Sequence, residues 1–282
     1  MTNTGSSSPN ISNSPRIRKA RPSDLRDIAE ISDLTWGGED YLKDVFPFWL
    51  KEGGLYALTF GGKTVGVGKL TLFPGKVGWL EGLRIHPAYQ GKGYGKMLAG
   101  YVFAQGSEMI KSRKLRHLEF STYYMNRESI DIAGKAGFRL CETFTVIFRK
   151  RRKTVIEPER TLIPPMMFSR FGEHIPLGWH HIKNTPEGIR YLKSRIRTYI
   201  AGKSIFFDER NPKRKDRAFT LVSFRKADII ELIRSFNALC EAPGYELVIP
   251  SYLKRHIPFL IENGFFFWDK PPAENVLVFR YP

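Results

Sequence analysis

Five consecutive residues after an apolar run have the composition of a phosphate-binding loop. They are Gly91, Lys92, Gly93, Tyr94 and Gly95, with Lys96 directly after them. Glycine lets a ligand approach the main chain closely and permits backbone angles that a Cβ disfavours. If the loop opens a helix, its free N–H groups and the helix dipole favour an anion, and the lysines add positive charge. The loop therefore predicts a phosphorylated ligand; the alternative is a flexible loop that binds nothing.

The spacing of the glycines differs from two common phosphate-binding motifs. A dinucleotide fingerprint requires Gly-x-Gly-x-x-Gly in a parallel βαβ unit, whereas Gly95 comes one residue too early for it. A Walker P-loop requires Ser or Thr after its Gly-Lys pair, and here Met97 follows Lys96. Neither motif describes this loop.

Residue patterns indicate the elements that position the loop. Period-two apolar runs and tight turns predict strands, and an apolar stripe at helical spacing predicts helices. The expected strands are 16–20, 55–60, 64–73, 77–85, 115–124 and 138–148, and the expected helices are 22–34, 96–113 and 126–137. Residues 35–54 are expected to form loops or short helices.

The C-terminal part of the chain repeats this order in a degenerate form. Strands are expected over 219–224, 245–250 and 275–281, with helices over 227–240 and 252–264, the second bent near Pro258. Gly137-Phe138 and Gly264-Phe265 occupy matching places, but the second copy has no glycine loop. We therefore predict four segments: a disordered tail 1–15, a ligand-binding domain 16–150, a linker 151–167, and a degenerate copy 168–282.

Composition narrows the class of protein. The formal net charge of +17 favours anionic partners without choosing among them. The two cysteines, Cys141 and Cys240, are expected to be free thiols, although their spacing does not exclude a disulfide. Neither a signal peptide nor a membrane-spanning apolar run is evident, so we expect a soluble, cytoplasmic protein without a membrane partner.

The segment from Gln90 to Gly95 resembles the Gln/Arg-x-x-Gly-x-Gly/Ala signature of the GNAT superfamily of acetyl-CoA-dependent N-acetyltransferases. The preceding strand with His86-Pro87, and the segment 126–138, resemble further parts of the family pattern. The resemblance covers about residues 16–150. It implies an α+β fold with a mixed sheet, splayed open beside strand 77–85, followed by a degenerate GNAT-like second domain.

The resemblance also implies where acetyl-CoA would bind. Main-chain amides from Lys92 to Lys96 would hold the pyrophosphate, and the backbone of residues 83–85 would bind the pantetheine arm. The implied cofactor-binding residues are Leu83, Arg84, Ile85, Gln90, Gly91, Lys92, Gly93, Tyr94, Gly95, Lys96 and Asn126. Asn126 has an alternative role as the cap of the following helix.

Acetyl transfer to an amine needs a base, and release of CoA is helped by an acid. Glu81, an acid in an apolar strand, is the candidate base; the alternative is a structural ion pair with Arg84 or another cation. Many GNAT enzymes carry their acid seven residues after the motif's Asn, where this chain has Ala133. Tyr124 is the preferred substitute, with Tyr123 or water as alternatives.

Residues 36–50, together with Glu81-Gly82-Leu83-Arg84, are similar to the histidine N-acetyltransferase group. This shorter similarity implies a free amino acid as acceptor, with its α-amine at Glu81 and its carboxylate at Arg84. Glu39, Asp40 and Tyr41 would line the site. The alternative is that the aromatic residues there only form a hydrophobic lid, namely Trp36, Tyr41, Phe46, Phe48 and Trp49.

Two other functions remain open at this stage. A peptide or protein amine could be the acceptor, or the chain could be a non-catalytic CoA-binding module associated with RNA or the ribosome. The basic runs 149–153 and 211–217 favour the second, although such runs are usually solvated, so nucleic acid is not the preferred partner. His180 and His181 lack the spacing of a metal pair, and no metal site is expected.

Overall fold

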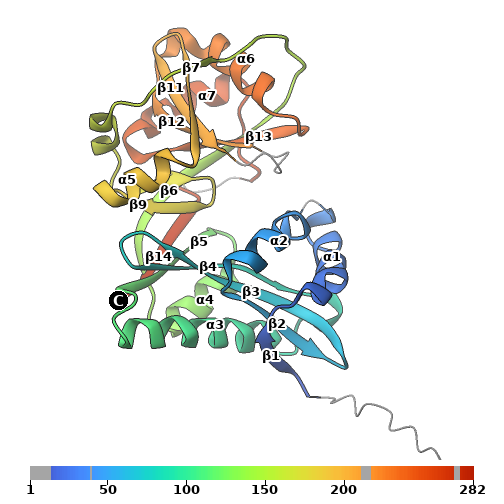
Figure 1. The fold of residues 1–282 in the computed structure, drawn as a ribbon. Helices are drawn as coiled ribbons and strands as arrows, with labels where there is room; N and C mark the ends of the chain where they lie inside the picture. The colour runs from blue at the N-terminus through green and yellow to red at the C-terminus, as the bar shows by residue number, and fades with distance from the viewer. Residues whose placement is uncertain (1–13, 39, 211–216, 270–273) are drawn as a thin grey trace, which may run out of the picture. The chain divides into compact units, whose positions relative to one another are not determined.

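The computed structural model describes residues 14–38, 40–210, 217–269 and 274–282 (Figure 1). The chain forms two compact units, Met1–Thr71 with Leu80–Ser112, and Leu72–Trp79 with Arg113–Pro282. Most of the predicted tail 1–15 lies outside the described residues. No helix in the described part of the chain is long and apolar enough to cross a membrane.

The first unit is a sheet with helices on both faces. Its strands follow the order β1 (Arg16–Lys19), β2 (Leu55–Phe60), β3 (Lys63–Phe73) and β4 (Val77–Ile85), of which the last residues of β3 and the first of β4 belong to the second unit. β1, β2 and β3 pair antiparallel. The helices are α1 (Leu25–Asp33), α2 (Leu42–Glu52) and α3 (Tyr94–Lys111).

Side chains of β3 alternate between the two faces of this sheet. Val67 packs into a core with α1 and α2, whereas a Cβ on Gly66 or Gly68 would contact Leu98 of α3. We call these the α2 face and the α3 face. Figure 1 shows α1 and α2 on one side of the strands and α3 on the other.

Strand β4 changes its regular alternation at Gly82. Gly82 has a φ of +66°, a left-handed conformation that favours glycine, and a Cβ there would lie 2.5 Å from the ring of Trp49 on α2. Leu83 and Ile85 both approach the glycines of β3 on the α3 face. The strand thus bends where the indole of Trp49 packs against bare backbone.

The second unit continues with a larger mixed sheet. Val77–Trp79 of β4 pair in parallel with His117–Glu119 of β5. The order continues with β5 (His117–Tyr123), β14 (Val276–Tyr281), β6 (Arg139–Lys150), β13 (Gly244–Ile249), β12 (Arg217–Ser223), β11 (Ser204–Glu209), β10 (Ile196–Ala201) and β7 (Glu159–Arg160). β12 and β13 are parallel, and the other neighbours are antiparallel.

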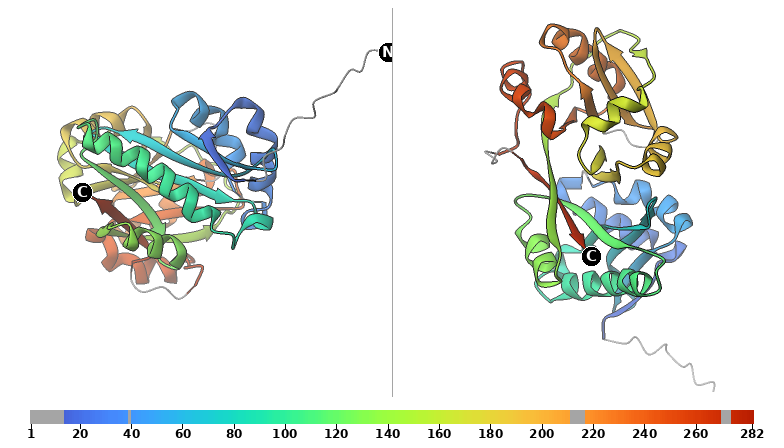
Figure 2. Two further views of the ribbon diagram at one scale, coloured as in Figure 1. Left: turned by 90° about the horizontal axis from the view of Figure 1, so that it is seen from below. Right: turned by 90° about the vertical axis from the view of Figure 1, so that its left-hand side faces the viewer.

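The C-terminal strand β14 lies between β5 and β6 and pairs with both. Figure 2 shows it running along the first part of the long strand β6. The compact units therefore follow different boundaries from the predicted segments 16–150 and 168–282, since the last strand of the chain joins β5 and β6. The predicted division into domains stays a prediction.

Helices and a hairpin complete the second unit. They are α4 (Arg127–Lys135), α5 (Pro186–Lys193), α6 (Ile229–Leu239) and α7 (Ile257–Glu262), and the hairpin is β8 (His174–Leu177) with β9 (His180–Lys183). The expected α+β class with a large mixed sheet is confirmed. The expectation of free thiols is also confirmed, since neither Cys141 nor Cys240 forms a disulfide.

Buried charges attach the β8–β9 hairpin to the sheet. The imidazole of His174 lies between two carboxylates, with Nδ1 2.6 Å from Glu142 on β6 and Nε2 3.0 Å from Glu119 on β5. Lys183 Nζ donates to Glu119 at 2.5 Å and Arg280 Nε donates to it at 2.7 Å. Because buried charges are stable only when paired, this network holds three strands of the sheet and the hairpin together.

The network also sets the protonation of its histidines. Burial alone would lower the pKa of His174, but the hydrogen bonds to Glu119 and Glu142 outweigh it and raise the pKa, against the opposing charge of Lys183. Burial lowers the pKa of the neighbouring His117 to about 4. The two histidines thus differ in direction: the pKa of His174 lies above the ordinary value, and that of His117 lies below it.

Replacing His174 by Gln is expected to change how stability depends on pH. Its folded pKa lies above the unfolded value of about 6.5, so its contribution is complete below that value and is lost as pH rises through the folded pKa. The variant should be about 3 kcal/mol less stable at pH 6 and lack that loss at higher pH. Urea unfolding measured from about pH 6 to about pH 9 tests this.

The matched control is His117→Gln, whose pKa change lies on the acid side of this range. It should retain the loss of stability of the parent chain above about pH 6.5. An unchanged decline in the His174→Gln chain would show that His174 is not the titrating group.

Replacing Gly82 by Ala is expected to destabilise the first unit by roughly 2–4 kcal/mol. The new Cβ would adopt an unfavourable left-handed backbone and would overlap the ring of Trp49. The control Gly100→Ala, in open space on α3, should be neutral or stabilising by about 0.5–1 kcal/mol. Denaturant unfolding of both variants gives the comparison, and equal stability of the two would contradict the role assigned to Gly82.

Candidate active site

The glycine loop has the geometry of a main-chain anion site. Gly91 and Gly93 have φ values of +75° and +79°, and a Cβ on either would meet nothing within 4 Å. Gly93 is the N-cap of α3, and the first hydrogen bond of the helix runs from Met97 N to Gly93 O at 3.0 Å. The amides of the turn between them have no acceptor inside the helix, so they can bind an anion.

Two aromatic contacts fix the side chains of the loop. The ring of Tyr94 stacks on Tyr89 at a centroid distance of 6.4 Å, and Lys92 Nζ lies 4.9 Å from the centroid of the same ring. The side chains therefore rest on the segment before the loop. The amides of the first turn of α3, with Lys92 beside them, fit the diphosphate that the predicted acetyl-CoA site requires.

The carbonyl groups at the end of β4 accept side-chain hydrogen bonds. Gln90 Nε2 donates to Ile85 O and Arg84 Nη1 donates to Leu83 O, both at 3.0 Å. A carbonyl oxygen has two lone pairs, so each can accept a second bond from a ligand amide. Gln90 thereby joins the glycine loop to the strand whose backbone is predicted to bind pantetheine.

Glu81 lies on the α2 face of the first unit. The hydroxyl of Thr71 donates a short hydrogen bond to its carboxylate. Lys69, two residues before Thr71 on β3, pairs with Glu52 of α2, so Thr71 lies on the same face by alternation. Glu81 stays the predicted base.

Arg84 forms an ion pair with Asp40. Arg84 Nε and Nη2 donate to the two oxygens of Asp40 at 3.2 and 3.3 Å, and the Asp40 side chain is 0% exposed. With Nη1 bound to Leu83 O, one N–H on each of Nη1 and Nη2 has no acceptor among the described residues, and we call these two groups the Arg84 fork. A fork of this kind matches a carboxylate.

The other residues predicted to line the acceptor site differ in where the structure places them. Tyr41 lies near Arg84, whose Cζ is 5.9 Å from the ring centroid, and Glu39 lies outside the described residues. The lid alternative holds for Phe46 and Trp49, which are buried. It fails for Trp36, which is 64% exposed.

The candidate acid Tyr124 has an unforeseen partner. The hydroxyls of Tyr123 and Tyr124 both donate to Oδ1 of Asp269, at 2.9 and 3.0 Å. Burial and this hydrogen bond raise the pKa of both tyrosines, so both are protonated at neutral pH. Asn126 caps α4 by accepting from Ser129 N at 3.2 Å, which confirms its alternative role. No sequence signal pointed to Asp269.

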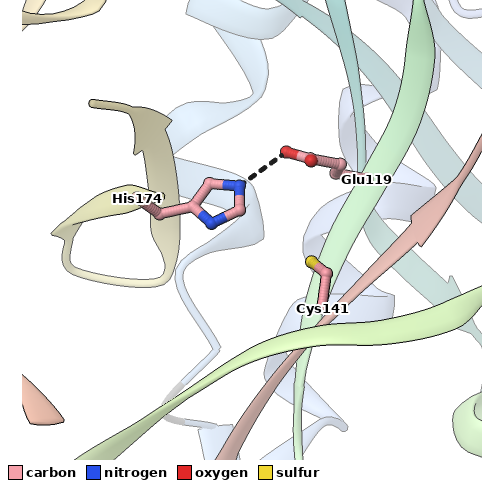
Figure 3. Close-up of side chains that lie close together, drawn as sticks. All are labelled: Glu119, Cys141 and His174. Atoms are coloured by element: carbon pink, nitrogen blue, oxygen red, sulfur yellow. Dashed lines mark hydrogen bonds and ion pairs between the residues drawn. The ribbon is translucent and has the colours of Figure 1, made fainter. Parts of the chain in front are cut away.

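Glu119, Cys141 and His174 form a second group with chemically active side chains, and their ligand atoms lie within 4.8 Å of one another. Figure 3 shows His174 directed at Glu119, with Cys141 beside them. The Cys141 thiol donates to Val278 O, and burial raises its pKa to about 11, so it is neither a thiolate nucleophile nor a ready metal ligand. Lys183 occupies the position beside Glu119 that a cation would take.

Comparison with known proteins agrees with this geometry. Residues 24–138 match the acetyltransferase (GNAT) family. A candidate acetyltransferase from Thermoplasma acidophilum is 16% identical, with a TM-score of 0.63 over 94% of this chain and 99% of its own. A candidate acetyltransferase from Pyrococcus horikoshii, also 16% identical, has a TM-score of 0.61 over 99% and 93%.

A GCN5-related N-acetyltransferase from Sphaerobacter thermophilus is 12% identical, with a TM-score of 0.60 over 95% of both chains. Identities this low show a shared fold alone. No curated protein sequence matches the chain. Enzymes of this family take the acetyl group from acetyl-CoA. Residues 24–138 thus belong to the acetyltransferase (GNAT) family, and the chain shares its fold with structures of acetyltransferases.

Proposed function

We propose that the chain transfers an acetyl group from acetyl-CoA to the α-amine of a free amino acid with a histidine-like side chain. The observation that supports this most is the state of Arg84. Its guanidinium is held on one edge by the buried Asp40, and one N–H on each of Nη1 and Nη2 has no acceptor among the described residues. A carboxylate has two oxygens that can accept both N–H groups, and a free amino acid carries a carboxylate beside its amine.

Two side chains of β4 then have different roles in the reaction. Acetyl-CoA supplies the acetyl group as a thioester. Arg84 holds the carboxylate of the acceptor, which limits where its amine can lie. Glu81, on the α2 face with Thr71 as hydrogen-bond donor, accepts the proton that the ammonium must lose before it can attack.

Main-chain groups hold the donor in this proposal. The first-turn amides of α3 bind the pyrophosphate, and the carbonyls of Leu83 and Ile85 bind the pantetheine arm. Tyr124 gives a proton or a hydrogen bond to the departing sulfur, and Asp269 keeps its hydroxyl oriented until then. The absence of the family's tyrosine at Ala133 makes a substitute necessary.

A CoA-release screen over free amino acids, their amides, polyamines and short peptides tests the proposal. A free amino acid should saturate the enzyme, and its amide should lose roughly 10- to 100-fold in kcat/KM because it leaves the Arg84 fork without a carboxylate. Arg84→Lys keeps the charge but removes the fork, so it should erase most of that discrimination. Preference for a peptide, or equal rates for acid and amide, would overturn the assignment.

Replacing Glu81 by Gln should lower kcat by about 10²–10⁴-fold. The residual rate should increase with pH up to the pKa of the acceptor amine, because only the neutral amine can attack without a base. Calorimetry should show unchanged acetyl-CoA affinity. The control Glu30→Gln, an exposed carboxylate of the same unit, should behave like the parent. An unaltered kcat in Glu81→Gln would remove Glu81 from the mechanism.

A further inference from the structure

The backbone at Trp36 is strained. Its φ is +49°, and Gly37 and Gly38, which follow it, have φ values of +68° and +90°. Of the described residues, only Lys76 and Arg113 are other non-glycine residues with a positive φ; Lys76 lies in the turn between β3 and β4, and Arg113 follows α3. A bulky aromatic residue in the left-handed region is a rarer case, and such strain is found mostly at functional sites.

Burial does not offset this strain. The Trp36 side chain is 64% exposed, so most of its apolar surface contacts water. Within the same segment, Phe46 and Trp49 are buried in the core with α1 and α2. The conformation of Trp36 therefore needs an explanation other than core packing.

The partner of the indole is Arg84. The guanidinium Cζ lies 4.2 Å above the ring centroid, a distance typical of a stacked cation–π pair. The position of the Arg84 guanidinium is fixed independently of Trp36, since Asp40 and Leu83 O accept three of its N–H groups. One face of the indole thus lies on a cation that is held in place, and most of the Trp36 side chain is exposed to solvent.

We propose that Trp36 determines which amino acid is accepted, by stacking its exposed indole face on a planar side chain such as imidazole or phenyl. This inference rests on the proposed function, because it needs the acceptor carboxylate at the Arg84 fork. With the carboxylate there, the side chain of the acceptor extends from an atom that is one bond away, next to the ring that covers the guanidinium. Aromatic rings prefer offset or edge-on contact with a flat partner, whereas an aliphatic group gains only from its buried area.

The test compares acceptors with a planar ring, with a non-planar ring and with no side chain. Phenylalanine and cyclohexylalanine have rings of similar size, and glycine has no side chain to stack. We expect the parent chain to prefer phenylalanine over cyclohexylalanine in kcat/KM by roughly three- to tenfold. Trp36→Leu should abolish this preference, and Trp36→Phe should retain most of it.

Glycine as the acceptor distinguishes two roles of Trp36: recognition of the acceptor side chain and support of Arg84. If Trp36 acts on the acceptor side chain, Trp36→Leu should lower kcat/KM for phenylalanine by roughly three- to tenfold more than for glycine, and acetyl-CoA affinity should be unchanged. If Trp36 only supports Arg84, the variant should lose activity toward glycine and phenylalanine equally, and this overturns the inference. Far-UV circular dichroism and the Trp36→Phe variant show whether a loss reflects misfolding.

The same panel of acceptors tests the role of Trp36 separately from the proposed function. Acetylation of amino acids without any preference for planar side chains overturns the role of Trp36 and leaves the proposed function intact. Failure of every free amino acid, while a peptide or polyamine saturates the enzyme, overturns both.

Discussion

A single left-handed residue, Gly82, decides which side chains of β4 reach which face of the sheet. In a regular strand, residues two apart share a face, so Glu81 and Leu83 would lie together. The structure instead has Glu81 bonded to Thr71 on the α2 face, while Leu83 approaches Gly68 on the α3 face. The bend at Gly82 accounts for this change, because an irregular residue shifts the alternation of those after it.

In the proposed function, one strand therefore serves both substrates. Leu83 and Ile85 pack toward α3, whose first-turn amides are proposed to bind the pyrophosphate, and Arg84 extends toward Asp40 on the opposite face with Glu81. An arginine in that position would be costly to bury alone. Its pairing with a fully buried carboxylate lowers that cost and also orients the guanidinium. A lysine in the same place would pair with the carboxylate but would have no planar group to orient.

The sequence was sufficient where the structure depends on local backbone. The glycine loop, the first helical turn and the hairpins of the first unit follow from residue types a few positions apart, and all appear at the expected places. Partners distant in sequence were not predictable. Asp40 lies 44 residues from Arg84, and nothing in either segment shows that the two would pair.

Partners distant in sequence also explain why much of the second unit was not predicted. Strands β8 and β9 have four residues each, too few for a periodic pattern, and the partners of His174 come from β5 and β6. The insertion of β14 between β5 and β6 joins segments that are more than 100 residues apart. Such pairings are set by tertiary packing, which single-chain propensities do not encode.

The two strained places in the first unit differ in what relieves them. At Gly82 the lack of a Cβ removes the conflict, so the left-handed backbone there costs little more than the entropy of glycine. At Trp36 a Cβ and a large exposed ring remain, and the contact that holds them is the one with Arg84. A strained tryptophan and a buried aspartate thus both depend on one guanidinium, and neither arrangement improves the core. Since strain persists only where the surroundings impose it, Arg84 and its two partners are better explained by the handling of an acceptor than by the stability of the fold.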